Sequence, residues 1–380
     1  MQTPAGNRRD LNNLCDQRFV VRRMERALLG GDVRAAPARS RSLLAGSLVT
    51  VLTLVVCVVL AFLSPRPTVE DAPIVMGRQT GALYVRLGDT LHPVLNLASA
   101  RLIAGTDADP RPVRESDIGR MPRGPLLGIP GAPQLLGAAL SDTAAWSVCD
   151  TGGTAPATTV IAGAGAPPGP ARSDSGAILI QSGSPAETTT YLVHRGRRTV
   201  VNLGDPAVAG GLRWDGVPPR RVSAWLVNAI PESPPDPDSA GFSDRAVPVG
   251  DDTALCVTWD RRPDGETGLT VSVGAGLPLP AGQAPVALAQ ADGDGPALDA
   301  VSLPPGHCGY LRTTGGGARY LVTDTGVRFT VGDDDAARSL GLPEVPAPVP
   351  WPVLAGLPAG PQLSRQHALV ARDVVDAGPS

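Results

Sequence analysis

The sequence contains no lysine, and all 33 of its basic residues are arginine. A P-loop uses a lysine ammonium at the β- and γ-phosphates of a nucleotide, and a Schiff-base enzyme uses a lysine amine. Both chemistries therefore lack their usual residue in this chain. The net charge of -3 is also small, which argues against a nucleic-acid-binding surface on the main domain.

Aromatic residues are scarce as well, at 3% of the sequence, whereas glycine and proline number 45 and 40. Such a composition favours short strands and tight turns over long helices. The hydrophobic content of 42% over 380 residues is enough for a sizeable core. We predict an α+β fold in which turn-rich β structure predominates.

The residue patterns of common catalytic and metal sites are missing. The four histidines do not form H-E-x-x-H, no G-x-S-x-G elbow occurs, and no glycine-rich run matches G-x-G-x-x-G. Two acidic runs, Asp292 to Gly295 and Asp333 to Asp335, lack the closing glutamate of a calcium-binding EF-hand loop. A turn and a helix N-cap are the better interpretations. We predict no catalytic residue, no cofactor site and no metal site.

One long apolar run stands out, from Leu43 to Leu63. Its 21 residues carry no charge and would cross about 30 Å of hydrocarbon as a helix. A buried core helix rarely runs this long without stronger polar residues. A cleaved signal peptide has a shorter apolar region behind a short basic stretch, whereas 42 residues precede this run. We therefore predict a single transmembrane helix.

Arginines are distributed unevenly around this run. Only Arg66 follows within a dozen residues, and nine precede it: Arg8, Arg9, Arg18, Arg22, Arg23, Arg26, Arg34, Arg39 and Arg41. The positive-inside rule then places the N-terminus in the cytoplasm. We expect a cytoplasmic arm over 1–42, the helix over 43–63, a linker over 64–73 and a periplasmic domain over 74–380.

The cytoplasmic arm contains an amphipathic stretch in which apolar residues recur at helical spacing and arginines lie largely on the other face. Such a helix rests on anionic lipid or docks to a cytoplasmic partner, and the pattern alone leaves both open. The residues that we expect at a docking site are Arg18, Phe19, Arg22, Arg23 and Arg26.

A recurring pattern predicts repeats in the periplasmic domain. Three segments each give a strand, a turn, a second strand and a helix-like stretch, followed by an apolar, proline-containing tail; in the first copy this tail is LLGIPGAPQLL, from Leu126. The repeats are expected over 80–136, 188–235 and 318–363, with or without a fourth, degraded copy over 285–315. A central mixed β core is expected over 140–185 and 245–280. The predicted domain is elongated.

Five cysteines are too few for a disulfide-dense scaffold. Cys15 and Cys57 lie before and within the apolar run, so only three cysteines would meet an oxidising exterior. Cys149 and Cys256 lie in similar short strands, AAWSVCD and ALCVTWD, and we expect them to form a disulfide. Cys308 is then a free thiol, or a partner in an alternative pairing.

Several blocks resemble the EccB family, the single-pass membrane component of type VII (ESX) secretion systems. They include RFVVRRMERALLGGD from Arg18, GALYVRLGDTLHPVLNLASARLI from Gly81, MPRGPLLGIPGAP from Met121, WSVCD, LCVTW, YLVTDTGVRF and VPAPVPWPVLAGLPAGPQL from Val345. The resemblance spans nearly the whole chain, which looks shorter in its centre than typical members. It also implies the pairing of Cys149 with Cys256.

The resemblance implies a role in protein export within an inner-membrane complex. The implied partners are EccC, which is an FtsK-like ATPase, EccD, EccE and other copies of the chain, with the mycosin protease as a further candidate. The leading hypothesis is a structural subunit that oligomerises through its periplasmic domain. The enzyme alternative, a nucleotide hydrolase without a P-loop, would need an arginine phosphate site such as Arg195, Arg197 and Arg198. An envelope-binding module is the third hypothesis.

Overall fold

The structure is a computed structural model that describes residues 46, 48–57 and 59, and residues 72–373 with internal gaps. The gaps are 154–156, 164–171, 174–175, 185–186, 217, 235–245, 248, 262–265 and 294. The chain divides into two compact units, Met1–Arg66 and Pro67–Ser380.

In the first unit, residues 48–57 are helical and expose their leucine and valine side chains. Within the portion of the chain that the structure describes, no helix is both long enough and apolar enough to cross a bilayer. The predicted span over 43–63 is described only in part, and the predicted arm over 1–42 lies outside the described residues.

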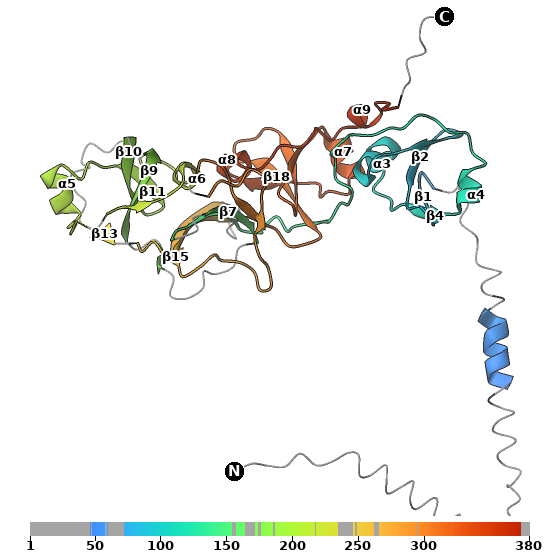
Figure 1. Ribbon diagram of the computed structural model, residues 1–380, viewed down its shortest axis with the longest axis horizontal. Helices are drawn as coiled ribbons and strands as arrows, with labels where there is room; N and C mark the ends of the chain where they lie inside the picture. The colour runs from blue at the N-terminus through green and yellow to red at the C-terminus, as the bar shows by residue number, and fades with distance from the viewer. Residues whose placement is uncertain are drawn as a thin grey trace, which may run out of the picture. The chain divides into compact units, whose positions relative to one another are not determined.

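The second unit begins with a four-stranded sheet in the order β3-β2-β1-β4 (Figure 1). Three strands form an antiparallel meander, and the fourth returns parallel to the first. Helix α3, Leu97–Ala104, makes the crossover, and helix α4, Glu115–Ile118, follows the last strand. The strands are β1 (Ile74–Gly77), β2 (Leu83–Leu87), β3 (Thr90–Pro93) and β4 (Arg111–Val113).

A second sheet repeats this order as β11-β10-β9-β12. Helix α5, Pro206–Gly211, precedes the parallel strand, and helix α6, Ala224–Ala229, follows it. A short additional strand, β13 (Ala246–Val247), also pairs with β9. The other strands are β9 (Ala177–Ser184), β10 (Glu187–His194), β11 (Arg197–Val200) and β12 (Arg220–Arg221).

A third sheet has the same order again, β20-β19-β18-β21. Helices α7, Asp334–Ser339, and α8, Trp351–Ala355, take the places of α3 and α4. Strand β5 (Ala138–Ala139) joins β18, and helix α9 (Arg365–Ala368) follows. The strands are β18 (His307–Thr313), β19 (Arg319–Thr323), β20 (Arg328–Val331) and β21 (Ala347–Val349).

The central sheet has seven strands in the order β16-β17-β7-β6-β14-β15-β8. Its middle strand β6 is buried from Trp146 through Asp150, so both faces of the sheet are covered there. The strands are β6 (Trp146–Thr151), β7 (Ala157–Ala162), β8 (Arg172–Ser173), β14 (Ala254–Arg261), β15 (Thr267–Gly274), β16 (Val286–Ala287) and β17 (Ala300–Ser302).

After its second helix, each four-stranded unit sends a return segment back along its third strand. The return segments are Met121-Pro-Arg-Gly-Pro, Ile230-Pro-Glu-Ser-Pro and Leu357-Pro-Ala-Gly-Pro. In each, the carbonyl oxygen of the first proline accepts a backbone hydrogen bond of 2.9 Å from the third strand. The predicted tail of the first copy, from Leu126, lies beyond this segment and is therefore not the equivalent of the other two tails.

The third sheet is apolar on both faces. Leu311 and Val322 belong to the same core as the central-sheet residues Val148 and Leu255. Leu321, Phe329 and Val331, on the other face, share a second core with Ala98, Leu102 and Ile103 of α3. Helix α3 contacts both α7 and α9 (Figure 1), so the first and third sheets are packed together although they are far apart in sequence.

The C-terminal segment, residues 371–373, contacts residues 126–128, which follow the first sheet. The backbone N–H of Arg372 donates to Leu126 over 2.8 Å, and its Nε donates to the carbonyl of Gly128 over 2.9 Å. Leu127 and Ala371 form an antiparallel bridge. The last described residues are thereby bonded to the segment that follows the first sheet.

The strand-rich α+β class agrees with the prediction, but the element boundaries differ. The expected units started at 80, 188 and 318, whereas the sheets begin one strand earlier, at β1, β9 and β18. Strand β9 lies within the expected core range and yet belongs to the second sheet. In place of a fourth copy over 285–315, β16 and β17 extend the central sheet, because the buried β17 pairs in parallel with β7.

The close approach of the third return segment to its strand can be tested at Gly360. A Cβ there would lie 2.3 Å from Cε1 of Phe329, whose side chain is buried. We expect Gly360→Ala to lower the free energy of unfolding by about 1–3 kcal/mol through overpacking, measured by denaturant unfolding.

Gly210→Ala is the matched control, because Gly210 lies in α5 and its Cβ would meet no atom within 4 Å. That variant should be neutral or more stable by up to about 1 kcal/mol. Equal effects of the two substitutions would contradict the packing argument.

Candidate functional site at the central junction

The central sheet carries a disulfide between neighbouring strands. Cys149 on β6 lies directly opposite Cys256 on β14, with a Cα–Cα separation of 4.1 Å and an S–S bond of 2.07 Å. Both side chains are buried, and 107 residues separate them in sequence. This pairing is the one expected from the sequence. The bond fixes the register of these two strands. The residues of the second sheet lie between the two strands in the sequence.

The next residue along β6, Asp150, binds the start of α6. Its carboxylate accepts hydrogen bonds from the backbone N–H of Ser223 over 2.6 Å and from the Ser223 hydroxyl over 2.9 Å. The Ser223 hydroxyl in turn accepts from the N–H of Leu226 over 3.1 Å, which caps the helix. A buried carboxylate of the central sheet therefore positions the helix that follows the second sheet.

Arg220 on β12 joins the second sheet to the ends of the disulfide-linked strands. One Nη donates to the carbonyl of Asp150 over 3.1 Å, and the other donates to Gly250 over 3.2 Å and to the Thr253 hydroxyl over 2.8 Å. Gly152, beside the Arg220 guanidinium, has no room for a side chain. A Cβ there would lie 2.2 Å from the Asp251 carbonyl oxygen. The guanidinium thus connects the end of β6 to the turn that precedes β14.

Burial shifts both charged groups of this junction. It raises the pKa of the Asp150 carboxyl, against the opposing effect of hydrogen bonds from Ser223 and Thr158 and of the Arg220 charge. It lowers the pKa of the Arg220 guanidinium, against the attraction of Asp150 and two neighbouring aspartates. The directions are those expected when charges leave water and are paired imperfectly. We interpret this cluster as a structural junction between sheets.

The arginines of the hydrolase alternative are largely occupied within the second sheet. Arg198 donates from Nε to the Ile230 carbonyl over 2.8 Å and forms a 2.9 Å ion pair with Glu232. Arg197 donates to the Glu232 carbonyl over 3.0 Å. Arg195 lies in the hairpin turn with φ 51°. Two of the three guanidinium groups therefore hold the return segment, which opposes a role in binding phosphate.

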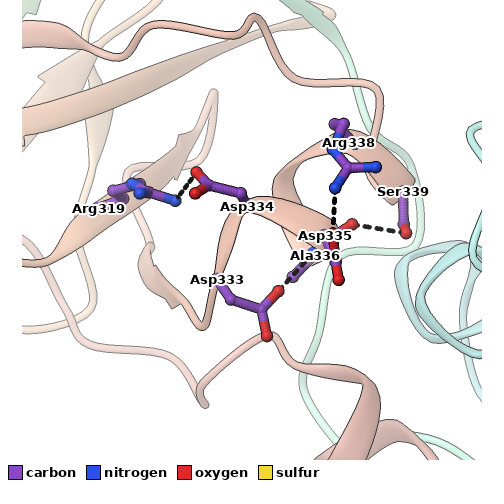
Figure 2. Close-up of polar contacts among 7 residues, drawn as sticks. All are labelled: Arg319, Asp333, Asp334, Asp335, Ala336, Arg338 and Ser339. Atoms are coloured by element: carbon purple, nitrogen blue, oxygen red, sulfur yellow. Dashed lines mark hydrogen bonds and ion pairs between the residues drawn. The ribbon is translucent and has the colours of Figure 1, made fainter.

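The acidic run at the start of α7 is engaged in the same way (Figure 2). Asp333 caps the helix by accepting from the N–H of Ala336 over 2.7 Å. Asp334 pairs with Arg319, and Asp335 pairs with Arg338 one turn further along. In the part of the chain that the structure describes, no three acidic, histidine or cysteine side chains cluster as metal ligands would. The carboxylates here stabilise a helix end.

The thiol of Cys308 is buried in the third sheet. Its Sγ lies 3.3 Å from the carbonyl oxygen of Gly137, to which it donates. Burial, with a further contribution from the charge of Asp324, raises the pKa of Cys308 to about 11. A thiol with so little thiolate at neutral pH is a poor nucleophile. The structure therefore gives Cys308 a packing role and leaves it unpaired.

Sequence reasoning identified the disulfide but missed the rest of the junction. Asp150 follows Cys149 directly, and Ser223 precedes an apolar stretch as a helix cap would, so each carried a local signal. No local signal connects Arg220 to the turn at Gly250. The predicted docking residues of the arm, from Arg18 to Arg26, lie outside the described residues.

The described residues define a strand-rich protein in which two of three similar sheets are fixed to a disulfide-linked central sheet and the remaining one packs on the third sheet. A model of the family described as "Type VII secretion system ESX-1, transport TM domain B" matches residues 12–236 and 243–377. The chain belongs to this family, the EccB components of type VII secretion systems.

Curated relatives match over nearly their full length. The ESX-3 secretion system ATPase EccB3 of Mycolicibacterium smegmatis is 34% identical over 471 residues, covering 96% of this chain and 90% of the relative. The ESX-5 secretion system ATPase EccB5 of Mycobacterium marinum is 31% identical, covering 94% and 92%. An alignment of 471 positions on a 380-residue chain means that the first relative has residues that this chain lacks.

Solved structures agree with the fold. A chain from the intact ESX-5 inner membrane complex is 27% identical with a TM-score of 0.69, covering 100% of this chain and 98% of that one. A chain of the EccB3 dimer from the ESX-3 core complex is 31% identical with a TM-score of 0.65, covering 79% and 100%.

The disulfide should dominate the stability of the second unit. Closing a loop of this length restricts the unfolded chain by about 4–5 kcal/mol in the chain-entropy model. We therefore expect the double substitution of Cys149 and Cys256 by alanine to lower the free energy of unfolding by several kcal/mol. Denaturant unfolding measures this, with Cys308→Ala as the control for losing a buried sulfur; an equal loss in the control would contradict the expectation.

The raised pKa of Asp150 predicts the sign of a pH dependence. An acid with a raised folded-state pKa stabilises the fold most below its unfolded value of about 4, and this contribution falls as pH rises toward the folded value. The advantage of wild type over Asp150→Asn in unfolding free energy should therefore shrink as pH rises above about 4. An advantage that grows with pH over that window would show that hydrogen bonding outweighs burial.

Proposed function

We propose that this chain is a structural and assembly subunit of a type VII secretion membrane complex and supports protein export by holding other subunits together. The observation that carries the proposal is the match of one family along nearly the whole chain, together with a likeness to chains of an ESX-5 inner membrane complex and an ESX-3 core complex dimer. The three similar sheets and their fixed junctions suit a scaffold.

The proposed topology has one helix over 43–63, a cytoplasmic arm over 1–42 and a periplasmic body from residue 74 onward. The charge asymmetry around the apolar run supports this orientation. We propose that the three sheets of shared strand order are copies of one repeat, of which the second and third pack on the central sheet and the first packs on the third. The arm would dock to EccC, EccD or EccE through Arg18, Phe19, Arg22, Arg23 and Arg26.

The hydrolase alternative has less support. The relatives carry the name ATPase, but this chain has no lysine, and Arg197 and Arg198 are bound to the return segment at Glu232. Because the bonds of these two arginines stay within the second sheet, a nucleotide would have to displace them. Hydrolysis that persists through purification and disappears on charge reversal of Arg195, Arg197 and Arg198 would restore this alternative.

The assembly role can be tested on the full-length chain, extracted from its host membranes in mild detergent. We expect a large particle containing further copies of the chain, an FtsK-like ATPase and a multispanning subunit. Recovery of the chain as a lone monomer would contradict the proposal.

Charge reversal within the arm separates docking from folding. The double substitution Arg22→Glu with Arg23→Glu should reduce recovery of the ATPase at least severalfold, because a basic helix face would become acidic. The pair Arg8→Glu with Arg9→Glu, outside the amphipathic stretch, is the matched control and should retain the partners. Equal losses in the two variants would mean that net charge, rather than a docking face, governs assembly.

A further inference from the structure

Each of the three similar sheets places an arginine over the tyrosine of its second strand. The guanidinium lies over the ring face, where the two groups attract each other. The distances from guanidinium carbon to ring centroid are 5.1 Å for Arg123 over Tyr84, 5.5 Å for Arg198 over Tyr191 and 5.7 Å for Arg328 over Tyr320. Arg198 and Arg328 lie at the same position on the third strand of their sheets, whereas Arg123 lies on the return segment of the first sheet. The second and third sheets can therefore be compared position by position.

In the second sheet the arginine is bound by the return segment. Arg198 donates from Nε to the carbonyl of Ile230 over 2.8 Å, and its Nη2 lies 2.9 Å from Oε1 of Glu232. Arg198 and Glu232 are bridge partners between the third strand and the return segment. A carboxylate that follows a proline is therefore the internal ligand of this guanidinium.

In the third sheet the same framework lacks the carboxylate. Arg328 donates from Nε to the carbonyl of Leu357 over 3.0 Å, as Arg198 does to Ile230. Its bridge partner is Ala359, which occupies the position of Glu232. Among the residues that the structure describes, no acidic side chain forms an ion pair with Arg328. One binding position on this guanidinium is thus open.

The third sheet adds an exposed aromatic residue beside the open position. Trp351, the first residue of α8, is 47% exposed, whereas α6 begins with Ala224. The Arg328 guanidinium carbon lies 5.3 Å from the Trp351 ring centroid. The ring centroids of Tyr320 and Trp351 are 6.2 Å apart. Tryptophan, tyrosine and arginine are the residue types that contribute most to protein interfaces. Their grouping here, in a chain with 3% aromatics, points to a binding surface.

We propose that Arg328, Trp351 and Tyr320 form a binding site for an acidic peptide segment of another protein. A glutamate or aspartate side chain would occupy the position that Glu232 takes on Arg198, and a neighbouring proline or aliphatic side chain would pack on the Trp351 ring. Carboxylate bonds to a guanidinium are charge-assisted and directional. In the second sheet the Pro231-Glu232 segment of the chain itself makes this contact with Arg198. The proposed site does not depend on the secretion role.

The test uses full-length protein in detergent and a capped peptide, Ala-Ile-Pro-Glu-Ser-Pro, with the sequence of residues 229–234. A second peptide has glutamine in place of glutamate. We expect calorimetric titration at low salt to show about tenfold tighter binding of the glutamate peptide, since one charge-assisted bond is lost in the other. Equal affinities for the two peptides, or no binding of either, would overturn the proposal.

Ala359→Glu is the sharpest variant, because it supplies the missing carboxylate internally without deleting any group. It should abolish the preference for the glutamate peptide while the thermal unfolding temperature is retained or raised. Ala359→Gln is the matched variant and should keep the preference.

Trp351→Ala should weaken both peptides equally. Arg312→Gln, at another exposed arginine of the third sheet, should leave both affinities unchanged. Loss of the preference in Arg312→Gln, or its survival in Ala359→Glu, would show that general surface charge attracts the peptide.

Discussion

The second unit depends on the double-sided packing of its third sheet. One face supplies Leu311 and Val322 to the core of the central sheet, and the other supplies Leu321 and Phe329 to the core shared with α3. A register shift of one residue would move every side chain to the opposite face and would disrupt the packing of both cores. The contact between distant parts of the sequence therefore requires that this one sheet keep its register.

The three similar sheets are fixed by different means, which accounts for their different surfaces. The second sheet is held through Arg220 and the Asp150–Ser223 contact, beside the disulfide-linked strands. The first sheet is held by apolar packing with the third and by the C-terminal segment at Arg372. A common backbone framework thus leaves the outer residues free to differ, as the exchange of Glu232 for Ala359 illustrates.

Much of this architecture could be read from local patterns, and the misses have physical causes. The hairpins at Tyr84, Tyr191 and Tyr320 were predictable from the alternation of apolar and polar residues and from the glycines in their turns. The first strand of each of these sheets was not predictable in this way. Strands β1 and β18 are separated from their parallel partners by a crossover that no local pattern marks. The Cys149–Cys256 pair was predictable from two similar strands. Arg220 was not, since its partners at Gly250 and Thr253 are backbone and hydroxyl groups without a sequence signature.

The C-terminal segment has a mechanical consequence. Leu126, Leu127 and Gly128, which follow the first sheet, bond to residues 371–372, so the last described residues are tied to the segment that leaves the first sheet. A force on the first sheet would be transmitted to the last described residues through these few bonds without unfolding the intervening sheets. Force that passes through the first sheet to this segment would thus be shared with the last described residues, so that the second and third sheets would not carry it alone.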